Sequence, residues 1–316
     1  MRPLIICTLV LPLVTLANAP QPLKWLRAAA YSPDGLMVAT AGDENVVRLY
    51  AVESGELRAS RTLPKGTNSF VTQLVWLGAN RIATSGSDGK VRVFDAGNLK
   101  ELRSWASGSS YVSGIAAPKS GSVVATSSYD NLAKTWDSST GKLKRKFSGL
   151  RSDAYAVAMS RDGKFVASGG PDGTCHIWRA ADGVLVRKLK PGQVMSIAFS
   201  PDGKYIAADG SYTKYYVYEI STGKLILSQP TDQAKIITGL AFSPDSKLLA
   251  IGDYAQQANV VDLTGELKAV LVGHKENLSS VEFSPDGKQL LTGSFDGTAK
   301  IWDIESGTCL KTLGGK

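Results

Sequence analysis

A unit of about 42 residues recurs along this 316-residue chain. In its clearest copy, residues 284–303 read SPDGKQLLTGSFDGTAKIWD, and close variants begin at Ser160 and Ser200. Seven copies place an aromatic or apolar residue at one equivalent position, at intervals of 40 to 44 residues: Tyr50, Phe94, Trp136, Trp178, Tyr218, Val261 and Trp302. A repeat of this period is typical of solenoids, propellers and arrays, so it constrains the fold before any site is considered.

Each copy predicts four short strands separated by turns. In the last copy the strands are expected at 279–283, 288–294, 298–303 and 309–313. Asp296-Gly297 separates two of them, and Asp-Gly favours a hairpin because the turn needs positive φ. A single four-stranded sheet cannot bury both of its faces, but seven sheets arranged radially cover one another. We therefore predict an all-β protein, a seven-bladed β-propeller with four antiparallel strands per blade, over residues 20–316.

The first strand of each unit should lie nearest the axis, where space is tightest. It is rich in small residues in most copies: Ala28, Ala29, Ala30, Gly114, Ala116, Ala156, Ala158, Ala198, Gly239 and Ala241. The last copy is complete at Leu313, so we expect the first and last blades to meet by face packing, without exchange of a strand.

These repeats resemble the WD-repeat β-propeller family, and the likeness covers about 290 residues. The copy closest to the family pattern contains Gly273-His274, Asp296 and Ile301-Trp302-Asp303. The resemblance implies a structural hydrogen-bonded chain of His274, Thr292 or Ser294, Asp296 and Trp302. It also implies structural roles for the blade tryptophans Trp136 and Trp178. No other copy has Gly-His, so most blades should cohere by apolar packing, and the Ser-Pro-Asp-Gly-Lys turns resemble the bacterial style of the family.

The N-terminus has the pattern of a secretory signal peptide. Arg2 precedes an apolar run from Leu4 to Leu16, and small residues follow up to Ala19. The run is shorter than the roughly 20 residues of a spanning helix. We therefore predict a signal peptide at 1–19, an exported protein and no membrane span. A buried N-terminal strand is the alternative, and Pro20 is a poor residue to follow a cleavage site.

The remaining cysteines and histidines are too few for a metal or a disulfide framework. Beyond the leader the chain has Cys175 and Cys309, which we expect to be two buried free thiols. Of the two histidines, His176 lies in mid-strand and is expected to face outward. No cofactor and no metal are expected.

A propeller enzyme is the competing hypothesis, with a hydrolase or lactonase site at the mouth of the central channel. The residues expected there are Arg27, Thr72, Gln73, Ser113, Ser279 and Ser280. They do not form a convincing ligand set, since hard metals want several oxygens and zinc wants His or Cys. Phosphate-binding and nucleophile-elbow motifs do not occur in the sequence. We therefore expect a protein without catalytic residues.

The favoured hypothesis is a binding scaffold that uses one loop rim of the propeller. Aromatic and basic residues recur in the connections expected on that rim: Phe70, Tyr111, Tyr129, Arg151, Tyr212, Lys235, Tyr254, Lys275 and Phe295. Exposed aromatic rings and Arg are frequent anchors of interfaces. The alternative, that these rings fold back over loop backbone, stays open. The expected partner is a protein or an anionic component of the cell envelope, bound by a monomer.

Two basic runs, Lys142–Lys146 and Arg187–Lys190, fall on the fourth strands of adjacent copies. They merge into one basic patch under one interpretation. Under the other they only protect outer edges, where Lys discourages sheet-to-sheet pairing. Nucleic acid is not the expected partner, because the runs lack interleaved stacking aromatics. The formal net charge of +8 is compatible with an anionic partner and identifies none.

Overall fold

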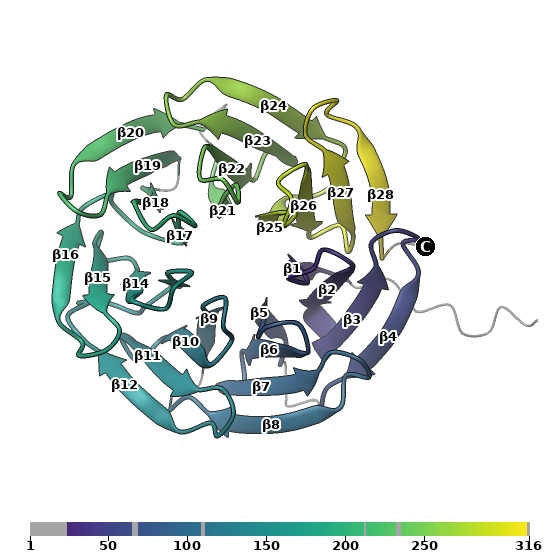
Figure 1. Cartoon of the computed structure of the whole chain (residues 1–316), viewed down its shortest axis with the longest axis horizontal. Coiled ribbons are helices and arrows are strands. Elements are labelled where there is room, and N and C mark those ends of the chain that lie inside the picture. The colour runs from purple at the N-terminus through teal and green to yellow at the C-terminus, as the bar shows by residue number, and fades with distance from the viewer. Residues whose placement is uncertain (1–23, 65–68, 109–110, 212, 232–234, 315–316) are drawn as a thin grey trace, which may run out of the picture.

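The computed structural model describes residues 24–64, 69–108, 111–211, 213–231 and 235–314. Over these residues the chain forms seven four-stranded antiparallel sheets, which stand as blades around a ring (Figure 1). Each blade uses four strands consecutive in sequence, and its first strand lies nearest the axis. The predicted seven-bladed β-propeller is confirmed. The signal peptide predicted at 1–19 lies outside the described residues.

The blades follow one another in chain order. Blade 1 contains β1 (Leu26–Tyr31), β2 (Met37–Gly42), β3 (Val46–Ala51) and β4 (Leu57–Thr62), and blade 2 contains β5 (Val71–Trp76), β6 (Arg81–Gly86), β7 (Lys90–Asp95) and β8 (Glu101–Ala106). Blade 3 contains β9 (Val112–Ala116), β10 (Val123–Ser128), β11 (Leu132–Asp137) and β12 (Leu143–Phe147), and blade 4 contains β13 (Ala156–Met159), β14 (Phe165–Gly169), β15 (Cys175–Arg179) and β16 (Leu185–Leu189). Blade 5 contains β17 (Ile197–Phe199), β18 (Tyr205–Gly210), β19 (Lys214–Glu219) and β20 (Leu225–Pro230). Blade 6 contains β21 (Ile237–Phe242), β22 (Leu248–Asp253), β23 (Gln257–Asp262) and β24 (Leu267–Val272). Blade 7 contains β25 (Leu278–Phe283), β26 (Gln289–Ser294), β27 (Ala299–Asp303) and β28 (Cys309–Leu313). One short 3₁₀ turn, η1 (Asp43–Asn45), joins β2 to β3. The strands predicted for the last copy agree with β25 to β28 to within one residue at each end.

The recurring aromatic position lies on the third strand of every blade and is buried in all seven. Trp302 pairs across the sheet with Leu290, and Trp136 pairs with Val124 in the same way. In every blade the pairing of the third and fourth strands shifts register at this residue, as it does between Ile301 and Trp302. A bulge bends its strand and redirects the side chains beside it. The side chain at this position therefore sits at a repeated bend and packs against the preceding blade, as Trp302 does against blade 6 and Trp178 against blade 3.

The hydrophobic core is divided among the interfaces between neighbouring blades. Seven clusters of buried residues each combine side chains of two adjacent blades. No blade has a core of its own within the described chain, which is the physical reason that seven units must close into a ring. Burying apolar area at every interface contributes roughly 25 cal/mol per Å² of surface removed from water.

The ring closes between blade 7 and blade 1, at a boundary that we call the seam. Leu26 and Tyr31 pack there against Leu291, Ile301 and Leu313. The backbone amides of Ala29 and Tyr31 donate hydrogen bonds to Ser280 Oγ and to the Glu282 carboxylate, at 3.2 and 2.9 Å. β1 pairs only with β2, and β28 only with β27, among the described strands. Closure by face packing, as expected from the sequence, is therefore what the structure shows.

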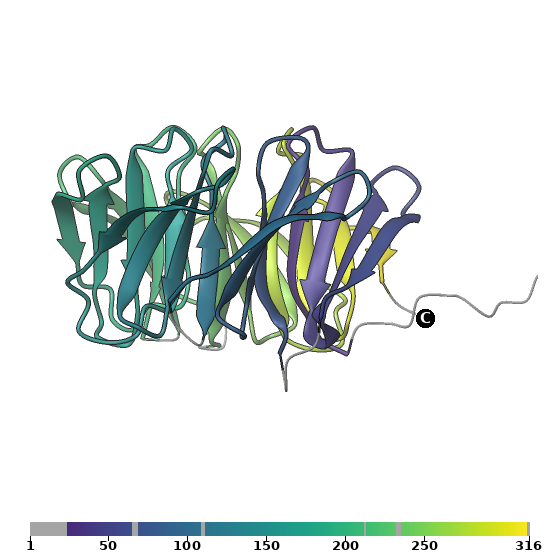
Figure 2. The same ribbon diagram turned by 90° about the horizontal axis from the view of Figure 1, so that it is seen from below.

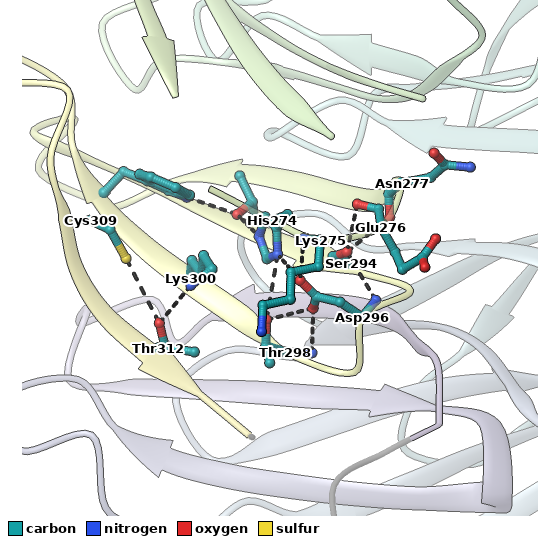
Figure 3. Close-up of polar contacts among 12 residues, drawn as sticks. His274, Lys275, Glu276, Asn277, Ser294, Asp296, Thr298, Lys300, Cys309 and Thr312 are labelled. Carbon is teal, nitrogen blue, oxygen red and sulfur yellow. Dashed lines mark hydrogen bonds and ion pairs between the residues drawn. The ribbon is translucent and has the colours of Figure 1, made fainter. Parts of the chain in front are cut away.

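Blade 7 contains a buried hydrogen-bonded chain, drawn in part in Figure 3. His274 Nδ1 lies 2.9 Å from Asp296 Oδ2, and His274 Nε2 lies 2.7 Å from Thr292 Oγ1. Trp302 Nε1–H donates to the same Thr292 oxygen at 2.8 Å, so that hydroxyl is left to donate to His274 Nε2. Burial opposes ionisation of Asp296, but hydrogen bonds from His274 and Thr298 and from the Lys275 amide hold its pKa below the usual range. The four residues link the loop before β25 to the blade interior.

Blades 2 and 3 replace the histidine with an ion pair that the sequence did not lead us to expect. Arg92 on β7 pairs with Asp88, and Lys134 on β11 pairs with Asp130, each four residues apart across the turn from the second strand. Trp136 Nε1–H donates to Thr126 Oγ1 at 2.9 Å, as Trp302 does to Thr292. The apolar packing expected for these blades is present, and the ion pairs and the Trp136–Thr126 hydrogen bond add to it.

Two placements expected from the sequence are wrong. Cys175 is buried, but Cys309 is exposed, because β28 is the outermost strand of blade 7. His176 does not face outward: it is 2% exposed and its ring meets the edge of Trp178 at 5.4 Å. Third strands are covered on both faces by neighbouring blades, so the alternation of side chains does not lead to solvent there.

Candidate functional site

One rim of the ring carries the connections that precede each first strand and the turns that follow each second strand. These segments lie along the lower edge of the molecule in Figure 2. Side chains at this edge are held by rigid strand ends on one side and open to solvent on the other. Binding surfaces are often built in this way, from loops on a stable scaffold.

Six aromatic side chains on this rim, together with Arg27, form a chain of contacts that we call the aromatic arc. Its rings, in spatial order, are Phe295, Trp25, Phe70, Tyr111, Tyr129 and Tyr155. They come from blades 7, 1, 2, 3, 3 and 4, so the arc runs around more than half of the rim and crosses the seam.

In the tyrosine half of the arc, Tyr111 stacks on Tyr129, and Tyr155 is tilted against Tyr129. The centroids of Tyr111 and Tyr129 lie 4.5 Å apart, and those of Tyr129 and Tyr155 lie 5.4 Å apart. Phe70 meets Tyr111 edge-on at 6.2 Å. Burial, with a smaller effect of the neighbouring phenols, raises the pKa of Tyr129 to about 12. Tyr129 is therefore neutral at physiological pH, and its ring presents both an apolar face and a polar tip.

Arg27 occupies the centre of the other half. Its guanidinium carbon lies 3.9 Å from the Phe70 centroid and 5.9 Å from the centroids of both Trp25 and Phe295. Nε donates to Asp43 Oδ1 at 2.6 Å. A cation over an aromatic face is favourable, and it fixes the rings in place before any partner arrives.

The arc remains accessible at two points. Trp25 and Tyr129 are each 44% exposed, while Phe70, Tyr111 and Phe295 are half-buried. The sequence left open whether the rim aromatics are exposed anchors or fold back over the loops. Both arrangements occur: the half-buried rings cover neighbouring groups, and the exposed rings offer apolar surface to solvent.

The axis of the ring is lined by the first strands. A central channel of about 670 Å³ runs between them, and Gln73, Ser279, Ser280 and Glu282 contribute polar groups to its lining. Thr72 and Ser113, expected at the channel mouth, instead donate to the Val112 and Ala154 carbonyls of the following blades, at 2.7 and 2.6 Å. These hydroxyls hold neighbouring blades together.

Comparison with known proteins agrees with this architecture. The model of the family described as IFT122 first beta-propeller matches residues 111–315, and the WD domain, G-beta repeat model matches residues 58–95. The chain belongs to the WD-repeat β-propeller family. Propellers of this family are in general non-enzymatic scaffolds that bind proteins.

The curated relatives of this WD-repeat propeller are much longer proteins. Echinoderm microtubule-associated protein-like 3 from Homo sapiens is 36% identical over 81 residues, which cover 25% of this chain and 9% of that protein. Periodic tryptophan protein 2 homolog from Dictyostelium discoideum is 28% identical over 99 residues, covering 31% and 11%. The matched part spans about a tenth of the length of these relatives.

The structure places the other rim residues of this WD-repeat propeller outside the arc. Tyr254 is 36% exposed on blade 6, and Lys235 is half-buried at the start of the same blade. Lys275 is exposed beside His274, and Arg151 is exposed at the entry to blade 4. Tyr212 lies outside the described residues.

Sequence reasoning missed Trp25 and Tyr155 as members of the arc. A positional signal for them exists. In blades 1 to 4 the residue directly before the first strand is aromatic in every case: Trp25, Phe70, Tyr111 and Tyr155. Alignment of the copies on their first strands, in place of the third-strand aromatic, would have found it.

Chemical groups suited to metal binding do not cluster in the described part of the chain. No set of three or more His, Cys, Asp or Glu side chains comes together there. Among the same residues, no helix is long and apolar enough to cross a membrane.

Proposed function

We propose that this WD-repeat propeller is an exported, non-catalytic scaffold that binds a protein of the cell envelope or its surroundings through the aromatic arc. The observation that carries the proposal is the continuity of the arc. Six rings and one guanidinium from five blades form a single preorganised surface, with Trp25 and Tyr129 exposed on it. Rigid aromatic anchors lose little conformational entropy on binding, and they dominate the energetics of many interfaces.

Export is part of the proposal and is supported by the N-terminal sequence alone. A charged residue, a short apolar run and a small-residue end form the order expected of a secretory leader. N-terminal sequencing of protein recovered from its own cell tests this part. Recovery of a chain that begins near residue 18 or 20 supports export, and recovery of a chain that retains Leu4–Leu16 contradicts it.

The binding surface is tested by affinity capture from the source cell after brief cross-linking. The test variant is Trp25→Ala combined with Tyr129→Ala, which removes the two exposed rings of the arc. The matched control is Tyr254→Ala, which removes an exposed ring from blade 6 on the same rim. Anchor residues of this kind each contribute about 2 kcal/mol or more, so the double variant should bind at least tenfold more weakly.

The expected result is a partner captured by the wild type and the control and lost with the double variant. Equal capture by all three proteins would contradict a role for the arc. Thermal unfolding of each variant is measured in parallel, so that loss of the fold is not mistaken for loss of binding.

A further inference from the structure

A second concave site lies on the rim of blade 4, outside the aromatic arc. It is a cavity of about 340 Å³ lined by Arg151, Asp172, Gly173, Thr174, Lys188 and Lys190. A water molecule takes about 30 Å³ of liquid volume, so the cavity has room for a ligand of several heavy atoms. Three separate segments build it: the entry to β13, the turn between β14 and β15, and the end of β16.

Three cationic side chains converge on this cavity without a carboxylate partner. Among the described residues, none of Arg151, Lys188 and Lys190 makes an ion pair. Several other basic residues near a turn aspartate are paired with it, as Lys164 is with Asp162 and Arg179 with Asp182. Like charges held around one cavity repel one another, and a bound anion would relieve that repulsion.

The single carboxylate in the cavity is already engaged by the loop itself. Asp172 Oδ2 accepts from the Arg151 amide at 2.8 Å, and Oδ1 accepts from the amide and hydroxyl of Thr174 at 2.9 and 2.7 Å. Burial disfavours its ionised form, but these hydrogen bonds outweigh that effect and lower its pKa. Asp172 thus fixes the shape of the site, and the charged groups of Arg151, Lys188 and Lys190 remain available to a ligand.

A buried histidine lies on the strand next to Lys188. His176 is paired across the sheet with Lys188, and within the described chain neither of its ring nitrogens has a hydrogen-bond partner. Burial, assisted by the charge of Lys188, lowers its pKa. In blades 2 and 3 the equivalent residue is a cation that pairs with the turn aspartate. Blade 4 lacks that ion pair among its described residues and instead has three exposed cations around one cavity.

Protection of a sheet edge does not account for this arrangement. Lys188 lies on the outermost strand, where such protection is useful, but Lys190 follows the end of that strand. Arg151 belongs to a different connection altogether. Edge protection gives no reason for the three side chains to share one cavity.

We propose that the blade 4 cavity binds a phosphate group, with Arg151, Lys188 and Lys190 as its ligands. A dianionic tetrahedral phosphate matches a site that offers one forked guanidinium and two ammonium donors. The proposal does not depend on the aromatic arc or on the function proposed for it. The phosphate belongs either to an ester, such as a phosphorylated side chain, or to free phosphate, and the test separates these two sources.

Titration at pH 7.5 with inorganic phosphate tests the site in the intact protein. Binding is followed by calorimetry and by the imidazole NMR signals, of which the chain has only two sets, from His176 and His274. We expect saturable binding that shifts the His176 signal and leaves the His274 signal unchanged. The double variant Lys188→Gln, Lys190→Gln should bind at least about tenfold more weakly.

The matched control is Lys204→Gln combined with Lys247→Gln. It removes the same charge from two exposed lysines in turns of the opposite rim, and it should bind phosphate as the wild type does. Substitutions at such exposed sites usually change stability by less than about 0.5 kcal/mol, so all variants should fold.

Chloride at the same ionic strength separates specific binding from charge screening. An equal effect of chloride and phosphate, or wild-type affinity in the Lys188, Lys190 double variant, would overturn the proposal. A short phosphoserine peptide is titrated as a further arm. If the peptide binds more tightly than inorganic phosphate, the site is assigned to a phosphate ester. If it binds equally or more weakly, the site is assigned to free phosphate. Both results support the site.

Discussion

Replacing Asp209 with asparagine should remove a pH dependence of stability that originates in blade 5. Asp209 lies on β18 and is fully buried. Its Oδ1 accepts from the amides of Met195 and Ser196, each at 2.8 Å, whereas Oδ2 has no partner among the described residues. The equivalent position in every other blade is small: Ala41, Ser85, Ser127, Gly169, Gly252 and Gly293. The carboxyl group of Asp209 therefore lies at a position where the other blades have a very small side chain or none.

Burial raises the pKa of Asp209 to about 7, although the two amide hydrogen bonds act in the opposite direction. In the unfolded chain the same group has its ordinary pKa of about 3.8. Since the folded pKa is the higher one, the folded state holds the proton longer, and the associated stability is lost as pH rises from about 4 to 7. One pKa unit corresponds to about 1.4 kcal/mol, so roughly 2–3 kcal/mol should be lost between pH 5 and pH 8.

Urea unfolding followed by tryptophan fluorescence measures this effect at several pH values from 5 to 8. Asn keeps the Oδ1 acceptor and cannot ionise, so the difference in unfolding free energy between wild type and Asp209→Asn should change by about 2–3 kcal/mol over that range. Other groups titrate in both proteins and cancel in the difference.

Asp262→Asn is the matched control for that series. Asp262 is a half-buried residue at the end of β23, and the hydrogen bond from Thr264 lowers its pKa. It is therefore ionised throughout the range, and its variant should differ from wild type by a constant amount. If the difference between wild type and Asp209→Asn is constant to within about 0.5 kcal/mol from pH 5 to 8, the argument from burial is refuted.

Three further predictions concern the blade interior and the thiols. Trp302→Ala should lower the free energy of unfolding by about 3–5 kcal/mol, as a large truncation in a packed core does. His274→Ala should lower it by about 1–3 kcal/mol, because Asp296 and Thr292 each lose one of their hydrogen bonds. Equal losses at both sites in urea unfolding would show that the blade interior has been placed wrongly. In the folded protein a thiol reagent should label Cys309 and leave Cys175 unlabelled until urea is added, which mass spectrometry of tryptic peptides would check.

The fold was predictable because its information is local and is repeated. Turn residues such as Asp296-Gly297 mark the hairpins, and the spacing of Trp302 and its equivalents counts the blades. Each copy supports the interpretation of the others, so an error in one copy is corrected by the rest. The errors arose where a single side chain had to be placed. Alternation along a strand leads to solvent only if one face is uncovered, and both faces of β15 are covered at His176.

The aromatic arc was less predictable, because its contacts join residues that are far apart in sequence. Phe295 meets Trp25 only after the ring has closed, and Tyr129 meets Tyr155 across a blade interface. Residue type marked Phe70, Tyr111 and Tyr129 as candidates, but it gave no order or contact among them. The ion pairs of Arg92 and Lys134 were missed for a different reason. The resemblance directed attention to histidine, whereas in these blades a cation at another position pairs with the turn aspartate.

The position of the arc connects binding to the integrity of the ring. The seam is closed by packing and by a few hydrogen bonds, without an exchanged strand among the described residues. Phe295 and Trp25 belong to blade 7 and blade 1, on opposite sides of this seam, and their rings are in contact across it. A partner bound to both rings can do so only while the seam is closed, so its binding free energy opposes opening, by about 2.7 kcal/mol when the partner is present at one hundred times its Kd. A partner on the arc would thus strengthen the boundary at which the first and last blades of the ring meet.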